Sequence, residues 1–297
     1  MNNRKIILSI AIYTSLASIA SFCMANTNIE ASFNSDQWEL SWSDEFDYTG
    51  LPNPKIWDYE HGYLGFNEEL QNYTDSPENA RVEDGLLIIE AHLKDVTAQR
   101  SKRIVEELEG SNAKVSILGS QEFTSARLIT RGKREFVHAR VEARARFNTG
   151  RGTWPAIWLL GDEDKNPWPL CGEMDIMEHV GFKPNHVYSA VHSKGSNFMN
   201  GAGVSKEVIL DDVWGDFHTY SVEWDAETIR YFVDDVCYHV INNGKRPDDD
   251  WPFVHDNPFY VILNIAVGGS WGGKEGIDKT AFPQRMEVDY VRVFKRK

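Results

Sequence analysis

The sequence predicts an all-β fold of two antiparallel sheets packed face to face. The chain of 297 residues contains many short runs that alternate between apolar and polar side chains, separated by Gly, Pro, Asn and Asp. Runs with helical periodicity are scarce. About 260 residues of such short strands fit a two-sheet sandwich better than a small barrel.

The clearest predicted strand covers residues 140–147. Its apolar and charged residues occupy opposite faces, with Val141, Ala143, Ala145 and Phe147 against Arg140, Glu142, Arg144 and Arg146. Ten further strands are expected at 38–44, 85–92, 123–130, 153–160, 173–178, 186–192, 218–224, 228–233, 259–265 and 287–294. The best helical candidate is 99–109, which could equally be a charged loop.

The chain organisation indicates an exported protein with one domain. Residues 1–25 have the pattern of a signal peptide: Arg4 and Lys5, an apolar run, and Ala25 at a small-residue cleavage site. Residues 26–36 are a polar, flexible lead-in, and 37–297 form the single domain. No second apolar run approaches the roughly 18–20 residues of a membrane span, so we expect an extracellular or periplasmic location. Cys171 and Cys237 could form a disulfide, and the sequence leaves this open.

The charge of the chain limits its partners. It carries 31 Lys and Arg against 45 Asp and Glu, a net charge of −14. Such a negative protein is poorly suited to nucleic acid or to anionic membranes, and a polyanionic substrate is disfavoured. Aromatic residues make up 12% of the chain. Most are expected in the core, and exposed Trp in a concave surface is the functional alternative.

The segment 173–178 carries the candidate chemistry, because it places three acids in one short strand. Glu173 and Asp175 are two residues apart and share a face, whereas strict alternation would bury Glu178 among apolar groups. A β-bulge near Ile176 and Met177 would return Glu178 to the face of the other two acids. Mutual repulsion would then raise at least one pKa, so that one acid stays protonated near neutral pH.

Two alternatives exist for these acids. Carboxylates on one strand face are often simply the solvated side of a sheet. Acids and imidazoles in this stretch and nearby could also form a metal site, with Glu173, Asp175, Glu178, His179 and His192 as its candidates.

Tryptophans around the acids favour a carbohydrate cleft over a solvated face. Trp154 and Trp158 fall on one face of the predicted strand 153–160, and their indoles would lie about 13 Å apart, which suits successive sugar rings. Trp168, just before the acids, is a third candidate for the cleft. His192 ends a later strand and could form a hydrogen bond near Glu178.

These residues resemble glycoside hydrolase family 16. The stretch 173–178 (EMDIME) is similar to its E-x-D-x-x-E signature, in the form typical of the laminarinase-like, endo-1,3-β-glucanase branch. Further similar stretches follow the family's order over almost all of the chain after the export signal: WSDEF (42–46), NEELQNYT (67–74), SARL (125–128), GRGTWPAIW (150–158), LNIAVGG (263–269) and FPQRMEVDYVR (282–292). Departures are Glu68, Asn72 and a long insertion at 95–121.

The resemblance implies a β-jelly-roll sandwich with a concave substrate cleft. It implies Glu173 as nucleophile, Glu178 as general acid/base and Asp175 as the assisting carboxylate. The implied substrate is a neutral polysaccharide, a β-1,3-glucan of the laminarin type, hydrolysed by a monomer with retention of configuration. Sugar-binding residues would be Asn67, Trp154, Trp158 and Gln284, with His192 beside the acid/base.

Asp289 suggests a further site. On a regular strand it shares a face with Val291 and Val293, and an acid on an apolar face needs a partner. The resemblance implies a structural Ca²⁺ held by Asp289 with carbonyls near Glu45 and Gly85, and an arginine or backbone partner is the alternative. No cofactor is expected for catalysis.

Three rival functions stay open. The same chemistry could act on mixed-linkage β-1,3-1,4-glucan or on a galactan of the agar or carrageenan type. The sandwich could bind sugar without turnover. The acids and histidines could instead serve a metal-dependent hydrolase.

Overall fold

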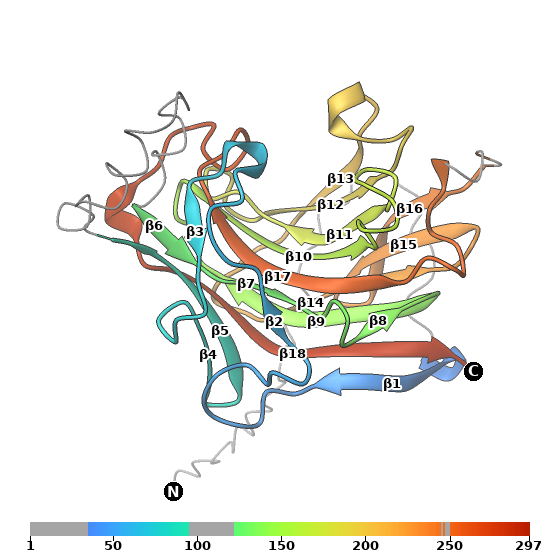
Figure 1. Ribbon diagram of the computed structural model, residues 1–297, viewed down its shortest axis with the longest axis horizontal. Coiled ribbons are helices and arrows are strands. Elements are labelled where there is room, and N and C mark those ends of the chain that lie inside the picture. The colour runs from blue at the N-terminus through green and yellow to red at the C-terminus, as the bar shows by residue number, and fades with distance from the viewer. Residues whose placement is uncertain (1–34, 95–121, 245, 247–249) are drawn as a thin grey trace, which may run out of the picture.

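The computed structural model describes residues 35–94, 122–244, 246 and 250–297. Two sheets lie one above the other, as predicted, and Figure 1 shows them as two curved layers. Among these described residues the strand pairs are antiparallel, except for one parallel pair between the strands Gln71–Tyr73 and Phe123–Ser125. The predicted helix at 99–109 and the insertion at 95–121 lie outside the described residues, as does the proposed signal at 1–25.

The first sheet has ten strands and forms the outer layer. In order across the sheet they are β16 (Val236–Asn242), β15 (Thr228–Val233), β14 (His218–Trp224), β9 (Ala139–Phe147), β18 (Gln284–Arg296), β5 (Leu86–Leu93), β6 (Phe123–Ser125) and β3 (Gln71–Tyr73), with β1 (Trp38–Asp44) beside β18 and β4 (Ala80–Glu83) beside β5.

The second sheet has eight strands and carries the acids. Its order is β13 (Val204–Ile209), β12 (His186–His192), β11 (Glu173–Glu178), β10 (Thr153–Gly161), β17 (Phe259–Val267), β7 (Arg127–Ile129) and β2 (Asp58–Tyr59), with β8 (Glu135–Phe136) beside β17. Helical turns in the described residues are short 3-10 segments, among them η1 (Ser35–Gln37), η2 (Phe66–Glu68), η5 (Phe198–Asn200) and η7 (Lys279–Ala281).

The core lies between the two sheets. The predicted inner face of β9 is correct: Val141, Ala143, Ala145 and Phe147 are fully buried in it. From the second sheet Met174, Ile176 and Met177 enter the same core. The outer face of β9 is less solvated than the alternation suggests, because Arg140 is buried and pairs with Glu142, Glu223 and Asp235.

The strands that the sequence pattern missed lie mostly at sheet edges. β16, β3, β13 and β2 end the two sheets, and the short strands β4 and β8 pair with β5 and β17 off the main strand order. Such strands bury only one face or less, so their apolar alternation is weak; β13, for example, has a single buried residue. The predicted strand 123–130 is divided at Ala126 into β6 and β7, which join different sheets.

In the described residues no helix is long and apolar enough to cross a membrane. Cys171 and Cys237 are both buried and do not form a disulfide with each other.

Candidate active site

A bulge in β11 places the three acids on one face, as predicted. Opposite β10, Glu173 pairs with Leu160, Asp175 with Trp158 and Glu178 with Ala156, and the register shifts between Asp175 and Glu178. The residues inside the shift, Ile176 and Met177, are both fully buried in the core. Two successive apolar side chains that both need burial therefore force the extra residue, and Glu178 returns to the face of Glu173.

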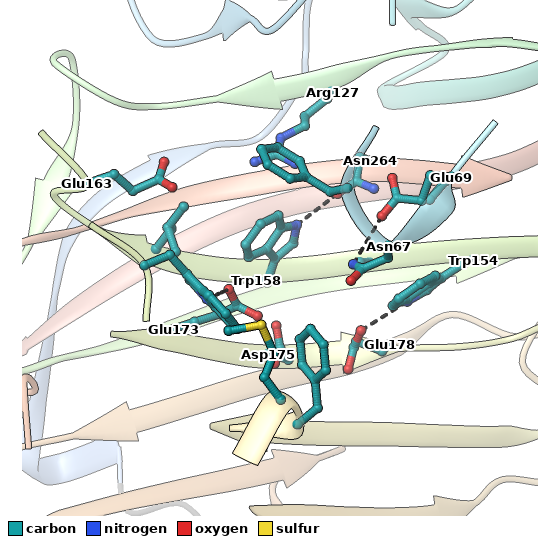
Figure 2. Close-up of a pocket in the computed structure, with 17 residues that line it drawn as sticks. Asn67, Glu69, Arg127, Trp154, Trp158, Glu163, Glu173, Asp175, Glu178 and Asn264 are labelled. Carbon is teal, nitrogen blue, oxygen red and sulfur yellow. Dashed lines mark hydrogen bonds between the residues drawn. The ribbon is translucent and has the colours of Figure 1, made fainter. Parts of the chain in front are cut away.

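The acids face a cavity of about 340 Å³ over the second sheet. Figure 2 shows Glu173, Asp175 and Glu178 in a row along β11, with Asn67 and Glu69 facing them from the other side. Of the predicted site residues, seven line this cavity: Asn67, Trp154, Trp158, Trp168, Glu173, Asp175 and Glu178.

Each glutamate accepts a hydrogen bond from a tryptophan. The Trp168 indole Nε1 donates to Glu173 Oε2 at 2.8 Å, and Trp154 Nε1 donates to Glu178 Oε1 at 2.9 Å. The indoles therefore orient the two carboxyls while leaving one oxygen of each without a tryptophan donor. Trp154 also packs edge-on against Trp271, with ring centroids 5.1 Å apart.

The enclosure of the acids changes their protonation. Burial raises the pKa of Glu173 to about 8, and the nearby charge of Asp175 adds to this. Burial likewise raises the pKa of Asp175 to about 8. For Glu178, burial and then the charge of Asp175 raise the pKa well above its ordinary value. At least one of the three carboxyls thus keeps a proton near neutral pH, which a general acid requires.

His192 lies at a different acid from the one expected. It pairs across the strands with Glu173, whereas Glu178 pairs with Tyr188. Its Nε2 lies 3.6 Å from Glu173 Oε1 and 3.4 Å from Asp175 Oδ2. The antiparallel register decides this, because it sets the end of β12 against the beginning of β11.

Trp158 is covered on one side by a cation. The Arg127 guanidinium lies 4.7 Å from the centroid of the Trp158 ring, and Arg127 also forms an ion pair with Glu60. Trp158 Nε1 donates to Asn264 Oδ1 at 2.8 Å, and Asn264 Nδ2 donates to Tyr73 at 3.1 Å. Stacking of a sugar on Trp158 stays a prediction, and only the ring face away from Arg127 is available for it.

The wall opposite the acids is polar. Asn67 adopts a left-handed backbone conformation, with φ at 51°, and its amide donates to Glu69 Oε1 at 3.4 Å. Gln71 Nε2 donates to Glu69 Oε2 at 2.7 Å. Burial raises the pKa of Glu69. This wall offers donors and acceptors suited to hydroxyl groups.

Ten further residues line the cavity that the sequence interpretation did not select: Phe66, Glu69, Arg127, Ala156, Leu160, Glu163, Phe198, Met199, Asn264 and Ala266. Glu69, Arg127 and Asn264 lie inside stretches that resemble the family, which was the available signal. No such signal in the sequence marked Phe198 and Met199.

Gln284 does not line the cavity. Its Oε1 accepts a hydrogen bond from the Gly150 backbone N–H at 2.7 Å, and its Nε2 donates to the carbonyls of Ala281 and Pro283. The side chain is nearly buried, so it supports the neighbouring loops instead of facing the cavity.

The predicted face of Asp289 is wrong. A register shift in β18 lies between Val288 and Tyr290, so Asp289 is the extra residue of a second bulge. Its carboxylate turns out of the core and pairs with Arg144 at 2.6 Å. The metal was expected because a buried Asp289 would need a partner. Arg144 is that partner, so burial no longer argues for a metal.

The calcium site itself stays a prediction. The strand registers bring its three candidates together, because Asp44 pairs with Val291 and Leu87 pairs with Val288, which places Glu45 and Gly85 beside Asp289. The Glu45 carboxylate is held by Arg292 at 2.8 Å, which leaves its carbonyl as the candidate donor.

A metal could alternatively lie at the acids. Glu173, Asp175 and His192 each offer a ligand atom, and these atoms lie within 4.8 Å of one another. His179 does not join them: its Nδ1 lies 2.8 Å from the His186 carbonyl oxygen, and it packs against Phe147 in the core.

Comparison with known proteins identifies the family. Residues 94–292 match the model of glycosyl hydrolases family 16. The chain is 46% identical over 268 residues to a β-glucanase of Rhodothermus marinus, covering 87% of this chain and 85% of that protein. The X-ray structure of the laminarinase from Rhodothermus marinus superposes with a TM-score of 0.76, at 46% identity, over 88% of this chain and 98% of the other.

A second solved structure is similarly close. SCLam, a non-specific endo-β-1,3(4)-glucanase of the same family, has a TM-score of 0.76 at 36% identity, over 91% of this chain and 94% of the other. The shared jelly-roll fold, the family match and the row of acids agree. The chain belongs to glycosyl hydrolase family 16 and is a glycoside hydrolase.

Proposed function

We propose that this protein is an exported, retaining endo-β-1,3-glucanase that hydrolyses laminarin-type chains. One observation carries the proposal: two glutamates lie on one strand face, each held by a tryptophan, with an aspartate between them, and all three line one cavity. The substrate class follows the β-glucanase and laminarinase of Rhodothermus marinus.

The proposed mechanism is a double displacement. Glu178, protonated because of its raised pKa, gives its proton to the glycosidic oxygen while the Glu173 carboxylate attacks the anomeric carbon. The leaving chain departs and a glycosyl-enzyme forms. Ionised Glu178 then takes a proton from water, which attacks the anomeric carbon and releases Glu173. His192 Nε2 lies 3.6 Å from Glu173 Oε1, and the charge of His192 and the hydrogen bond from Trp168 favour the ionised form of Glu173 that attacks.

Azide rescue tests the two roles separately. On an activated aryl β-glucoside of a short β-1,3-glucan, the variant Glu178→Ala should regain activity with azide and give a glycosyl azide of retained configuration. Glu173→Ala should give the inverted glycosyl azide, because azide then attacks in place of the nucleophile. The opposite stereochemical pattern, or full laminarin hydrolysis by either variant, would overturn the assignment.

A broader substrate range is the second candidate. SCLam, with 36% identity, is described as acting on β-1,3(4)-glucan. Product sizing after digestion of laminarin, lichenan and agarose distinguishes the candidates; we expect the highest kcat/KM on laminarin and none on agarose. Treatment with a chelator should leave hydrolysis intact, whereas a metal-dependent hydrolase would lose it.

Export and a monomeric state complete the proposal. The pattern of residues 1–25 supports export, and the strongly negative charge, which disfavours self-association, supports a monomer. Expression of the full gene should yield a protein shortened at its N-terminus outside the cytoplasm, and light scattering of that protein should give the mass of a single chain.

A further inference from the structure

An apolar loop stands over one end of the cavity. The connection between β12 and β13 carries η5, and Figure 1 shows this short helix rising above the second sheet. Phe198 is 56% exposed and Met199 is 67% exposed, yet both line the cavity. Exposing large apolar side chains to water is unfavourable, and two such side chains together at a cavity wall indicate a functional surface.

Hydrogen bonds from its own polar residues hold the conformation of the loop. Asn197, which is 3% exposed, donates to the carbonyls of Ser193 at 2.9 Å and Lys194 at 3.1 Å. Its Oδ1 accepts from the Asn200 backbone N–H at 3.1 Å, and Asn200 caps Asn197 in return. The conformation that presents Phe198 is therefore built into the loop and is not a random arrangement of an exposed segment.

A distant aspartate clamps this loop to the body of the protein. Asp250 Oδ1 accepts hydrogen bonds from the Ser193 hydroxyl at 3.2 Å and from the Gly195 backbone N–H. A Cβ on Gly195 would lie 2.3 Å from Asp250 Oδ2, so a larger residue there would push the carboxylate out of its present position. The next residue, Trp251, is buried and donates to the Ala226 carbonyl at 2.7 Å, which anchors the clamp.

Phe198 in turn packs against Trp168 and His192, two side chains that approach the Glu173 carboxyl from other segments of the chain. Its ring centroid lies 5.5 Å from that of Trp168 and 5.7 Å from that of His192. Trp168 donates to Glu173, and His192 lies 3.6 Å from the other oxygen. A continuous set of contacts thus joins Asp250, through the loop and Phe198, to the carboxyl of Glu173.

We propose that Asp250 is a positioning residue, which holds the loop 193–203 so that Phe198 keeps Trp168 and His192 against Glu173 and limits the access of water to that carboxyl. The proposal rests on the proposed function, because Glu173 is taken as the nucleophile. Loss of the clamp would let the two aromatic neighbours turn away, and small misplacements of a reacting group lower the rate strongly.

The first test compares Asp250→Ala with the wild type on laminarin. We expect kcat to fall about tenfold with KM changed less than about twofold, since positioning and not binding is lost. Asp250→Asn, which keeps the Oδ1 acceptor, should recover most of kcat. The matched control is Asp211→Ala, at an exposed aspartate whose backbone carbonyl, not its side chain, is hydrogen-bonded; it should behave as the wild type.

The pH profile distinguishes positioning from a purely structural role. Groups facing Glu173 are Asp175 and Glu178 on β11, His192 on β12 and Arg127 on β7. Burial is the largest cause of the raised pKa of Glu173, and the charge of His192 and the hydrogen bond from Trp168 lower that pKa by less. Better hydration of Glu173 in Asp250→Ala should therefore outweigh the loosening of these two contacts and lower its pKa. The acidic limb of kcat/KM should then move to lower pH, by about half a unit. A lower Tm with unchanged kinetics and an unmoved limb would overturn the proposal.

A double-mutant cycle tests the route through Phe198. If Asp250 acts through this ring, Asp250→Ala combined with Phe198→Ala should cost no more than the larger single change. Additive losses would show that Asp250 does not act through Phe198. A rise in KM alone would show that the loop only binds sugar. Either result would overturn the inference. Failure of the proposed function is recognised separately, as absence of laminarin hydrolysis by the wild type.

Discussion

Two bulges of this protein, one in β11 and one in β18, have opposite outcomes for an acidic residue. In β11 the bulge at Ile176 and Met177 directs the Glu178 side chain toward the cavity, beside two other acids. In β18 the bulge turns Asp289 out of the core, where Arg144 meets it. The same backbone device thus creates a reactive group on one sheet and an ordinary ion pair on the other, and the surroundings make the difference.

The electrostatics of the two faces follow the same division. Burial raises the pKa of Glu173 and Glu178 in the cavity. On the outer sheet, the hydrogen bond from Arg292 lowers the pKa of Glu45. Burial therefore favours the protonated form of the two cavity glutamates, whereas a guanidinium favours the ionised form of Glu45.

The largest expected difference between the bulges is in activity. Glu178→Gln should lower kcat/KM on laminarin by about 10³-fold, because it removes the proton donor. Asp289→Asn, at the other bulge, should stay within about twofold of the wild type, since it breaks one half-exposed pair far from the acids. A comparable loss for Asp289→Asn would show that the β18 bulge also supports the site.

The next effect concerns pH. The charge of Asp175 contributes to the raised pKa of both Glu173 and Glu178. Asp175→Asn should therefore lower both values and shift the whole bell-shaped profile of kcat/KM to lower pH, by about one unit. The kcat/KM profile on laminarin between pH 4 and 9 measures this, and an unmoved or upward shift would contradict it.

A smaller effect is expected on stability, where the variants Glu173→Gln and Glu45→Gln should have opposite signs. The pKa of Glu173 is raised to about 8, so its ionisation favours unfolding increasingly between about pH 4.5 and 8. Glu173→Gln should raise Tm at pH 8 by roughly 2–4 °C per kcal/mol gained and leave it unchanged near pH 4.

Glu45→Gln is the matched variant on the outer sheet. The lowered pKa of Glu45 means that its ion pair stabilises the fold above about pH 4.5 and is lost as the pH falls. Its side chain is 38% exposed, so solvent screening limits the loss to at most about 1 kcal/mol. Thermal unfolding at pH 4 and pH 8 compares the two variants. At pH 8 we expect a higher Tm for Glu173→Gln and a lower Tm for Glu45→Gln, and Tm changes of the same sign would contradict this.

The smallest expected effect is that of calcium at the β18 bulge. We propose that Ca²⁺ is held by the Asp289 carboxylate and the carbonyls of Glu45 and Gly85, with Arg144 displaced from the acid. Millimolar Ca²⁺ should raise Tm by a few degrees after chelator treatment, and Asp289→Ala should abolish the shift. An equal shift in the variant, or none in the wild type, would exclude this site.

Part of the site could be predicted because it depends on local periodicity. Two buried residues in succession, Ile176 and Met177, indicate a bulge between acids, and the alternation in 153–160 places Trp154 and Trp158 on one face. The same signal existed in β18, where the step from Val288 to Val291 is three residues instead of two, and the shared-face argument for Asp289 overlooked it.

The amino-acid pattern alone determined the sandwich, its core face in β9 and the row of three acids, because side-chain direction within one strand follows from the spacing of apolar residues. Only the tertiary structure decided that His192 lies at Glu173, that Gln284 stays out of the cavity and that Asp250 meets Gly195. Such contacts depend on the register between strands and on loop conformations, which join residues distant in the chain and leave no periodic trace.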